Sequence, residues 1–374
     1  MSDSSQIGLV LTGGGARGAY QAGVIRAITE ITDDMGIVNP FPVLTGTSAG
    51  AINATYLSSF AEDMTIASKR LVRLWTRIST KQVYRIDLLS MAGIGLRWLL
   101  ELSSGGLSPK KKARALLNTE PLMELIQRGI KFQKIQENID KGYIHSLALT
   151  AVNYSSGNSR TFFQGGAGVE PWERLRRKGL AANITPEHIM ASTAIPMLFP
   201  PIKLDGQYYG DGSLRNYTPL SPAIKLGAQK LIVVGVRRKE NKLMEHMDMS
   251  PTPARILGVL LNSVLLDAID YDYERLTRIN HTLKFVHETA ETPLKKVDVL
   301  MIRPSQDLGI IASEEAEHMP KTILHFIHGL GTSQEASDLI SYLLFEPSYT
   351  GRLIELGQKD AMEKETDIRA FFHQ

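Results

Sequence analysis

Short apolar runs alternate with helix-periodic segments through the first sixty positions of the chain. The runs Ile7–Leu11 and Phe41–Leu44 predict buried strands, and the segments Ala19–Ile31 and Ala49–Phe60 have the spacing of helices. A glycine-containing turn separates each strand from the helix that follows it. This order is typical of a right-handed βαβ unit, so the pattern predicts a mainly parallel central sheet in an α/β fold.

The rest of the chain continues this pattern and then becomes helical. Further strands are expected at Ser146–Val152, Thr161–Gln164, Leu231–Val236 and Asp298–Arg303. From Thr252 onward nearly everything has helical spacing, and Arg255–Asn280 is the longest helical pattern. The charged segment Arg237–Pro253 is the plausible internal boundary. We therefore expect an α/β domain over residues 1–240 and a mainly helical C-terminal region, 241–374, packed on it.

Composition indicates an ordinary globular protein and excludes several kinds of chemistry. The chain has 374 residues and a hydrophobic content of 43%, enough for a sizeable core. It has no cysteine, which excludes disulfides, thiolate catalysis and cysteine-ligated metals. No H-E-x-x-H or similar metal-binding spacing occurs, and a net charge of +3 is too small to indicate nucleic-acid binding. We expect no metal, no cofactor and no nucleic-acid partner.

The hydropathy of the chain predicts a soluble, cytoplasmic protein. No segment offers about eighteen uncharged apolar residues, and the N-terminus lacks the features of a signal peptide. Leu88–Lys112 nevertheless combines apolar residues and Trp98 with a basic run at Lys110–Lys112. This segment is either a lid that contacts the inner membrane surface peripherally or an ordinary core helix with a solvated lysine face.

The pentapeptide Gly46–Gly50, with the sequence G-T-S-A-G, comes directly after the second expected strand. A G-x-S-x-G pattern between a strand and a helix is typical of a nucleophile elbow, a sharp turn that holds the serine hydroxyl clear of the backbone. Gly46 and Gly50 suit this turn because a bend so tight leaves no room for side chains beside Ser48. Composition alone would produce the pattern in about one chain in ten, so the interpretation needs a base and an oxyanion hole.

A second glycine-rich element, Gly13–Gly18, follows the first expected strand with the sequence G-G-G-A-R-G. It matches a dinucleotide-binding fingerprint, which also requires an acidic residue at the end of the second strand. Asp33 and Asp34 precede that strand, and its end is Thr45–Ser48. An oxyanion hole fits better, because backbone N–H groups of the loop would face the same sheet edge as Ser48. Arg17 either locks this loop or is a solvated surface arginine.

A base for Ser48 is harder to find in the local sequence. Nine histidines are present, but none lies in a glycine-rich loop where a Ser-Asp-His hydrolase would place its histidine. Asp211 stands out instead, because Leu204–Ser213 is typical of a hairpin through Asp205-Gly206 followed by a sharp Gly-Asp-Gly turn. Asp211 is therefore either an ordinary turn residue or a functional carboxylate in a cleft.

Four blocks together resemble the patatin-like phospholipase family, in particular its bacterial acyl hydrolases. They are Gly13–Gly18, Gly46–Gly50, the segment A-S-T-A-I-P-M-L-F-P-P at Ala191–Pro201, and Asp211-Gly212 followed by Asn216. Their order and spacing match the family, and the resemblance covers about Ile7–Val236. It implies a fold related to the three-layer sandwich of α/β hydrolases.

The resemblance implies a catalytic dyad in place of a triad. Carried over by position, Ser48 is the nucleophile and Asp211 is the base. The residues of the implied oxyanion element are Gly13, Gly14, Gly15, Arg17 and Gly18. A carboxylate in a partly desolvated cleft is a stronger base than in water, so no histidine is needed. The chain departs from the family at Ser213, where Gly or Ala is more frequent, and at Tyr217–Pro219, where Asn-Pro-Pro is frequent.

We therefore expect a serine lipid acyl hydrolase, similar to a phospholipase A or lysophospholipase, that cleaves fatty acyl esters through an acyl-enzyme. The alternative is a non-hydrolytic lipid- or acyl-binding regulatory protein on the same fold. A lipid or lysolipid is the expected partner. The C-terminal helices carry no motif, and covering the sheet, forming a homodimer and shaping the acyl pocket remain open roles for them.

Overall fold

A computed structural model describes residues 7–85, 115–239, 250–287 and 291–373 of the chain. The segment Leu88–Lys112, for which a lid is one interpretation, lies outside the described residues. Within the described ranges, no helix combines the length and the apolar character needed to cross a bilayer.

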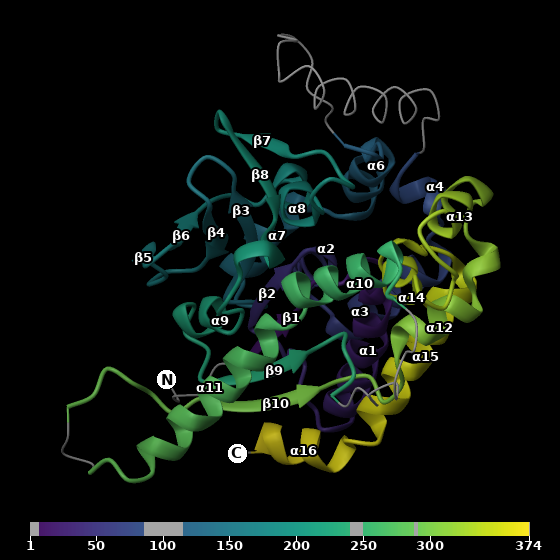
Figure 1. Cartoon of the computed structure of the whole chain (residues 1–374). Coiled ribbons are helices and arrows are strands. Elements are labelled where there is room, and N and C mark those ends of the chain that lie inside the picture. Colours follow the sequence, from purple (N-terminus) through teal and green to yellow (C-terminus); the bar gives the residue numbers. More distant parts are fainter. Residues whose placement is uncertain (1–6, 86–114, 240–249, 288–290, 374) are drawn as a thin grey trace.

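The centre of the molecule is a ten-stranded sheet with the order β10-β9-β1-β2-β3-β4-β6-β5, in which β8 also pairs with β3 and β7 (Figure 1). The strands are β1 Ile7–Leu11, β2 Val43–Thr47, β3 Ser146–Asn153, β4 Asn158–Gly165, β5 Trp172–Arg174, β6 Arg177–Ala181, β7 Ile202–Leu204, β8 Gln207–Asp211, β9 Lys230–Val234 and β10 Asp298–Ile302. The five strands from β10 to β3 are parallel, and β4 is antiparallel to β3. This confirms the expected fold class.

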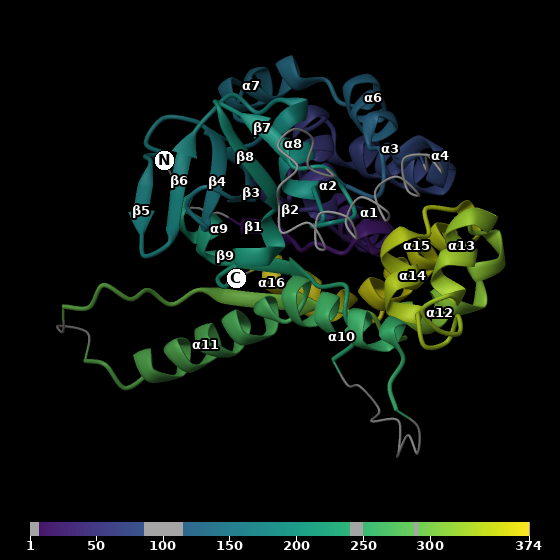
Figure 2. The ribbon, with the colours of Figure 1, turned by 45° about the horizontal axis from the view of Figure 1, so that its top comes forward.

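Helices cover both faces of this sheet (Figures 1 and 2). The N-terminal and middle helices are α1 Gly18–Asp34, α2 Ala49–Ser59, α3 Met64–Arg77, α4 Thr80–Val83, α6 Glu120–Gly129, α7 Phe132–Asp140, α8 Pro186–Thr193 and α9 Ser221–Lys225. The C-terminal helices are α10 Pro253–Leu265, α11 Ala268–Leu283, α12 Leu308–Glu314, α13 Lys321–His328, α14 Ser337–Leu343, α15 Pro347–Met362 and α16 Glu365–His373. Short 3₁₀ turns are η1 Gly15–Arg17, η2 Gly212–Arg215 and η3 Ala316–His318.

Alternate residues of the central strands enter two separate hydrophobic clusters. Leu9 and Leu11 of β1 belong to the larger cluster, which includes α1, α2 and α15. Val10, between them, belongs to a smaller cluster with α9 and α11. Because successive strand residues point to opposite faces, the central strands need apolar residues at nearly every position. The continuous apolar runs in the sequence reflect this double burial.

Two features differ from the sequence expectations. The Arg255–Asn280 pattern is not one helix, because α10 ends at Leu265 and α11 begins at Ala268. The break lets the two parts bury different faces: Leu265 joins the larger cluster and Ile269 the smaller one. The paired strands β5 and β6 were not expected, because the basic residues of this segment hide the period-2 pattern of a strand.

Residues from the C-terminal region complete the structure around β1 and α1. Strand β10 forms an edge of the sheet, and α15 packs along α1 (Figure 1). The contact between the helices is close because a Cβ on Gly23 would lie 2.1 Å from the carbonyl oxygen of Ile354. Likewise, a Cβ on Gly357 would lie 2.3 Å from the carbonyl oxygen of Tyr20. The proposed division at residue 240 therefore separates segments that share one core.

We predict that Gly357→Ala lowers the free energy of unfolding by roughly 1–3 kcal/mol, because the added methyl forces α15 away from α1. Gly351→Ala is the matched control, since it lies in the same helix with no atom within 4 Å of the added Cβ. That change should raise stability by about 1 kcal/mol through helix propensity. Urea denaturation of both variants measures the difference, and equal effects would contradict the close packing of α1 on α15.

Candidate active site

Ser48 lies in a strained turn between β2 and α2. Its backbone has φ 54° and ψ −125°, a combination that a non-glycine residue rarely adopts. A Cβ on Gly46 would lie 2.2 Å from the carbonyl oxygen of Gly50, and one on Gly50 would lie 2.2 Å from that of Leu11. Both flanking positions therefore require glycine, and the turn has the geometry of a nucleophile elbow.

Hydrogen bonds hold this turn against the neighbouring elements. The backbone N–H of Ser48 donates to Ser192 Oγ at 2.9 Å, and that hydroxyl donates to the carbonyl oxygen of Thr150 at 2.6 Å. Asn216 Nδ2 donates to Thr47 Oγ1 at 3.1 Å, directly before Ser48. Ser192 belongs to the Ala191–Pro201 block, so this block and Asn216 both help to fix the elbow.

Asp211 ends β8 and lies fully buried beside Ser48. Its backbone N–H donates to the carbonyl oxygen of Ala194, and its Oδ1 accepts from the N–H of Ser213 at 2.9 Å. The other oxygen, Oδ2, has no hydrogen-bond partner among the described residues. A Cβ on Gly212 would lie 2.0 Å from the carbonyl oxygen of Thr150, which explains the glycine after the aspartate. The Gly-Asp-Gly sequence thus places a carboxylate in the protein interior.

The electrostatic environment of Asp211 favours its neutral form. Burial raises the pKa of Asp211 to about 6, although the hydroxyl of Ser48 and the hydrogen bonds from Ser213 act to lower it. Ser48 is therefore close enough to influence the carboxylate, while its hydroxyl does not complete a well-aligned hydrogen bond with Oδ2. Catalytic hydrogen bonds are often long or poorly aligned before a substrate binds. A carboxylate with a pKa near 6 can accept a proton at neutral pH.

The glycine-rich loop after β1 passes beside Ser48 and Ser213. A Cβ on Gly13 would lie 2.5 Å from Ser213 Oγ and 3.1 Å from Ser48 Cβ, so the loop backbone contacts both. Gly14 has φ 158° and Gly15 has φ 58°. The N–H groups of Gly13 and Gly14 donate no backbone hydrogen bond to a described residue. Gly18 begins α1, where its Cα lies against Ala49. The loop therefore presents free donors beside Ser48.

Arg17 is buried, which contradicts the interpretation as a solvated surface arginine. Its Nε donates to Ser341 Oγ at 2.8 Å, and its Nη2 pairs with Asp338 Oδ1 at 2.9 Å. The guanidinium also lies 4.7 Å from the ring centroid of Tyr342. Arg17 therefore locks the glycine-rich loop to α14 of the C-terminal region. Asp338 and Ser341 gave no signal in the sequence, since they lie more than 300 residues away on an unremarkable helix.

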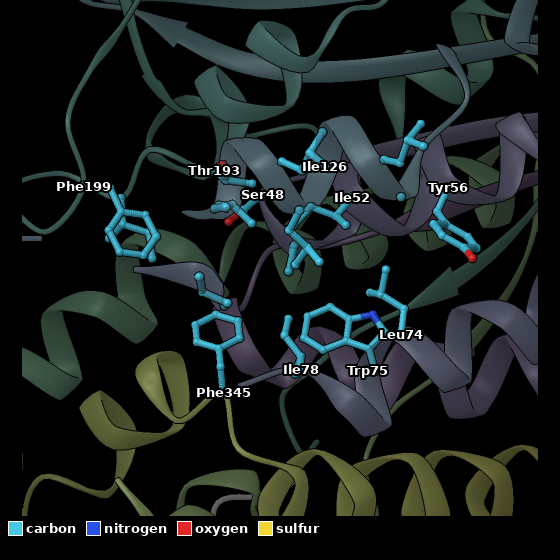
Figure 3. Close-up of a pocket in the computed structure, with 18 residues that line it drawn as sticks. Ser48, Ile52, Tyr56, Leu74, Trp75, Ile78, Ile126, Thr193, Phe199 and Phe345 are labelled. Carbon is cyan, nitrogen blue, oxygen red and sulfur yellow. The ribbon is translucent and has the colours of Figure 1, made fainter. Parts of the chain in front are cut away.

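An apolar pocket begins at Ser48 and extends along α2, between α6 on one side and α3 on the other (Figure 3). It contains about 610 Å³ of space between atoms, part of it open to solvent. The space is narrow, because little of it is wide enough for a water molecule. Lining residues include Ile52, Trp75, Ile78, Ile126, Phe199 and Phe345. Sequence reasoning missed the pocket because these residues have the spacing of ordinary core positions.

No histidine lines this pocket or bonds to Ser48 among the described residues. His188, on the same helix as Ser192, forms hydrogen bonds with Thr185 and contacts Phe162. The structure thus brings together Ser48, Asp211 and the glycine-rich loop.

Comparisons with known proteins found a match to one protein family. A family model described as patatin-like phospholipase matches residues 9–224. No curated protein shows significant sequence similarity to the chain.

Several solved structures are weakly similar. VipD from Legionella pneumophila is 13% identical, with a TM-score of 0.39, covering 98% of this chain and 67% of that one. Human GIVD cytosolic phospholipase A2 in complex with methyl gamma-linolenyl fluorophosphonate is 10% identical, with a TM-score of 0.39, covering 99% and 60%. The ExoU–SpcU complex of Pseudomonas aeruginosa is 14% identical, with a TM-score of 0.24, covering 98% and 59%. The chain thus spans about three fifths to two thirds of these longer proteins, and TM-scores this low carry no structural argument.

We predict that ionisation of Asp211 destabilises the protein. The native state holds this proton more tightly than the unfolded chain, so stability falls as the pH rises from about 4 through about 6. The full effect corresponds to about 3 kcal/mol. Asp211→Asn removes this ionisation. The free energy of unfolding of the variant, relative to that of the wild type, should therefore increase between about pH 4 and about pH 8.

Denaturation by urea at the two pH values measures this change. Asp205→Asn, on the exposed turn of the same hairpin, is the control and should show no such pH dependence. An Asp211→Asn variant whose relative stability is the same at both pH values would show that Asp211 has an ordinary pKa.

Proposed function

Since the chain belongs to the patatin-like phospholipase family, we propose that it hydrolyses fatty acyl esters of lipids through a Ser48–Asp211 dyad. The observation that carries this proposal is the buried Asp211 carboxylate beside a serine in a strained elbow, at one end of an apolar pocket. A strained turn, a buried aspartate or an apolar cavity does not by itself make an enzyme. Together they supply a nucleophile, a base and a place for an acyl chain.

In the proposed reaction, Ser48 Oγ attacks the ester carbonyl carbon while Asp211 Oδ2 accepts the hydroxyl proton. The oxygen that has no partner among the described residues is the one available for this proton. The tetrahedral intermediate then collapses, and the departing alcohol takes the proton from Asp211. Water hydrolyses the acyl-enzyme by the same route, releasing a fatty acid and restoring both residues.

The glycine-rich loop would stabilise the negative charge of the tetrahedral intermediate. The N–H groups of Gly13 and Gly14 have no backbone partner among the described residues, and Gly13 lies next to Ser48. Each such donor contributes roughly 3–4 kcal/mol to transition-state stabilisation in related chemistry. Arg17 does not touch the reacting atoms in this scheme. It is a positioning residue, because its bonds to α14 fix the loop that carries the donors.

The apolar pocket would hold the acyl chain. Each methylene that leaves water contributes about 0.8 kcal/mol to binding, so the narrow, apolar space favours a linear hydrocarbon. Ser48 and Thr193 lie at the end where the scissile ester would sit (Figure 3). The described residues of this pocket are almost all apolar, so they select for a hydrocarbon chain and not for a particular lipid headgroup.

We predict that Ser48→Ala abolishes both ester hydrolysis and labelling by a fluorophosphonate probe, because the nucleophile is gone. Asp211→Asn should lower kcat by about 10²–10⁴, because an amide cannot accept the proton. Asp205→Asn is the control for the hairpin and should retain activity. Hydrolysis of p-nitrophenyl butyrate and of phosphatidylcholine vesicles provides the two assays.

Two outcomes would redirect the assignment. A wild-type protein that hydrolyses no ester and does not react with the probe would be the non-hydrolytic lipid-binding protein. Full activity of Asp211→Asn would show that another residue, such as a histidine, acts as the base.

The pH dependence gives an independent test of the base. We predict that kcat/KM for p-nitrophenyl butyrate rises with pH and levels off above an apparent pKa of about 6, since only ionised Asp211 accepts the proton. Rates measured from about pH 4 to about pH 9, with the folded state verified by circular dichroism, define this profile. A rate that stays constant down to about pH 4 would exclude a base with a raised pKa.

A further inference from the structure

Helix α3 carries an unusual concentration of positive charge. Its sequence, Met64–Arg77, contains Lys69, Arg70, Arg73 and Arg77 and no acidic residue. Spacings of three and four residues place these side chains next to one another, and like charges at such spacings destabilise a helix. None of the four forms an ion pair with a described residue. The helix therefore bears a charge that an anion would neutralise.

The three arginines of this helix line a pocket on the surface. Arg70, Arg73 and Arg77 surround it together with Gln82, and the lining contains no carboxylate. The pocket contains about 590 Å³ of space between atoms, part of it open to solvent. Guanidinium groups bind carboxylates and phosphates through paired, charge-assisted hydrogen bonds. The pocket has the size and the charge to bind such a head group.

This arginine pocket adjoins the far end of the apolar pocket. Tyr56, Leu74, Ile78 and Leu125 line both spaces. In Figure 3, Tyr56 and Leu74 lie at the opposite end of the apolar pocket from Ser48. Tyr56 follows Ser48 by eight residues on α2, which corresponds to about 12 Å along the helix axis. The apolar pocket that begins at Ser48 thus ends next to a cluster of guanidinium groups, and four residues are shared by the two linings.

Tyr56 marks the change from apolar to basic surroundings. Burial raises the pKa of Tyr56, and the neighbouring Arg70 and Arg73 partly offset this increase. Its ring packs against Phe60, and the guanidinium of Arg70 lies 5.0 Å from the Phe60 ring centroid. Tyr56 therefore lines both the apolar pocket and the arginine pocket, whereas Arg70 and Arg73 line only the arginine pocket.

We propose that the two adjoining pockets form one site for a single-chain anionic amphiphile, whose head group binds Arg70, Arg73 and Arg77 and whose hydrocarbon chain extends towards Ser48. This orientation is opposite to that of a substrate acyl chain, which has its carbonyl at Ser48. A ligand bound in this way occupies the acyl pocket and blocks hydrolysis. This proposal rests on the proposed function in one respect: hydrolysis would release a fatty acid, which is a single-chain anionic amphiphile and could be the ligand.

Binding is tested first, in a form that does not depend on hydrolysis. Isothermal titration calorimetry of the Ser48→Ala protein compares decanoate with decanol, which has the same chain and no charge. We expect decanoate to bind more tightly and to weaken as salt is added. Arg73→Gln should weaken decanoate at least about tenfold and leave decanol unchanged. Arg128→Gln, an exposed arginine of α6 outside the pocket lining, is the matched control and should change neither.

Inhibition is tested second, with the active protein. Decanoate should inhibit hydrolysis of p-nitrophenyl butyrate competitively, and Arg73→Gln should raise the ratio of the decanoate to the decanol inhibition constant about tenfold.

Equal binding of decanoate and decanol by the Ser48→Ala protein would overturn the proposal, as would unchanged decanoate affinity in Arg73→Gln. Loss of binding to vesicles of phosphatidylcholine and phosphatidylglycerol in Arg73→Gln, with decanoate affinity intact, would assign the arginines to a membrane surface instead. If the protein hydrolyses no ester but still prefers decanoate in an Arg73-dependent manner, the proposed hydrolase function is wrong and the proposed binding site is supported.

Discussion

The site around Ser48 depends on how closely separate backbone segments approach one another. Gly46 of the elbow contacts Gly50 of the helix that follows, and Gly50 also contacts Leu11 at the end of β1. Gly212, directly after Asp211, contacts Thr150 of β3. At each contact a Cβ would lie between 2.0 and 2.2 Å from a carbonyl oxygen, so a side chain cannot be accommodated. The glycines of two sequence blocks, Gly46–Gly50 and Asp211-Gly212, therefore have a common steric cause. Because the backbone is packed this tightly, Ser48 and Asp211 are brought together without a long side chain between them.

A second contact extends this constraint to the C-terminal helices. Gly15 lies against the carbonyl oxygen of Tyr342, and the buried Arg17 pairs with the partly buried Asp338. Removing one partner of a buried ion pair costs far more than the pair contributes, because the remaining charge is left uncompensated. The loop that would bind the oxyanion is thus fixed by residues far away in the sequence. This contact with α14 indicates that the C-terminal helices help to shape the site around Ser48, in addition to covering the sheet.

The features predicted from the sequence are those with a local cause. The apolar runs of β1 and β2, and the glycines around Ser48, follow from periodicity and from steric limits that act over a few residues. The proposed role of Asp211 required the family resemblance, since a Gly-Asp-Gly segment has the same sequence pattern in an exposed turn as in a buried one. The partners of Arg17 could not be predicted, because an ion pair between residues 321 positions apart leaves no local pattern. The arginines of α3 were visible as charges, but their position beside the apolar pocket depends on the packing of α2, α3 and α6.

The long-range pairing of Arg17 also has a consequence for biosynthesis. During translation, α1 and the glycine-rich loop leave the ribosome more than 300 residues before Asp338 does. Contacts between such distant residues form late, because the chain must first lose the entropy of a very large loop. A nascent chain therefore carries Ser48 long before its glycine-rich loop can be fixed. The architecture delays assembly of the proposed centre until the helix that carries Asp338 has been synthesised.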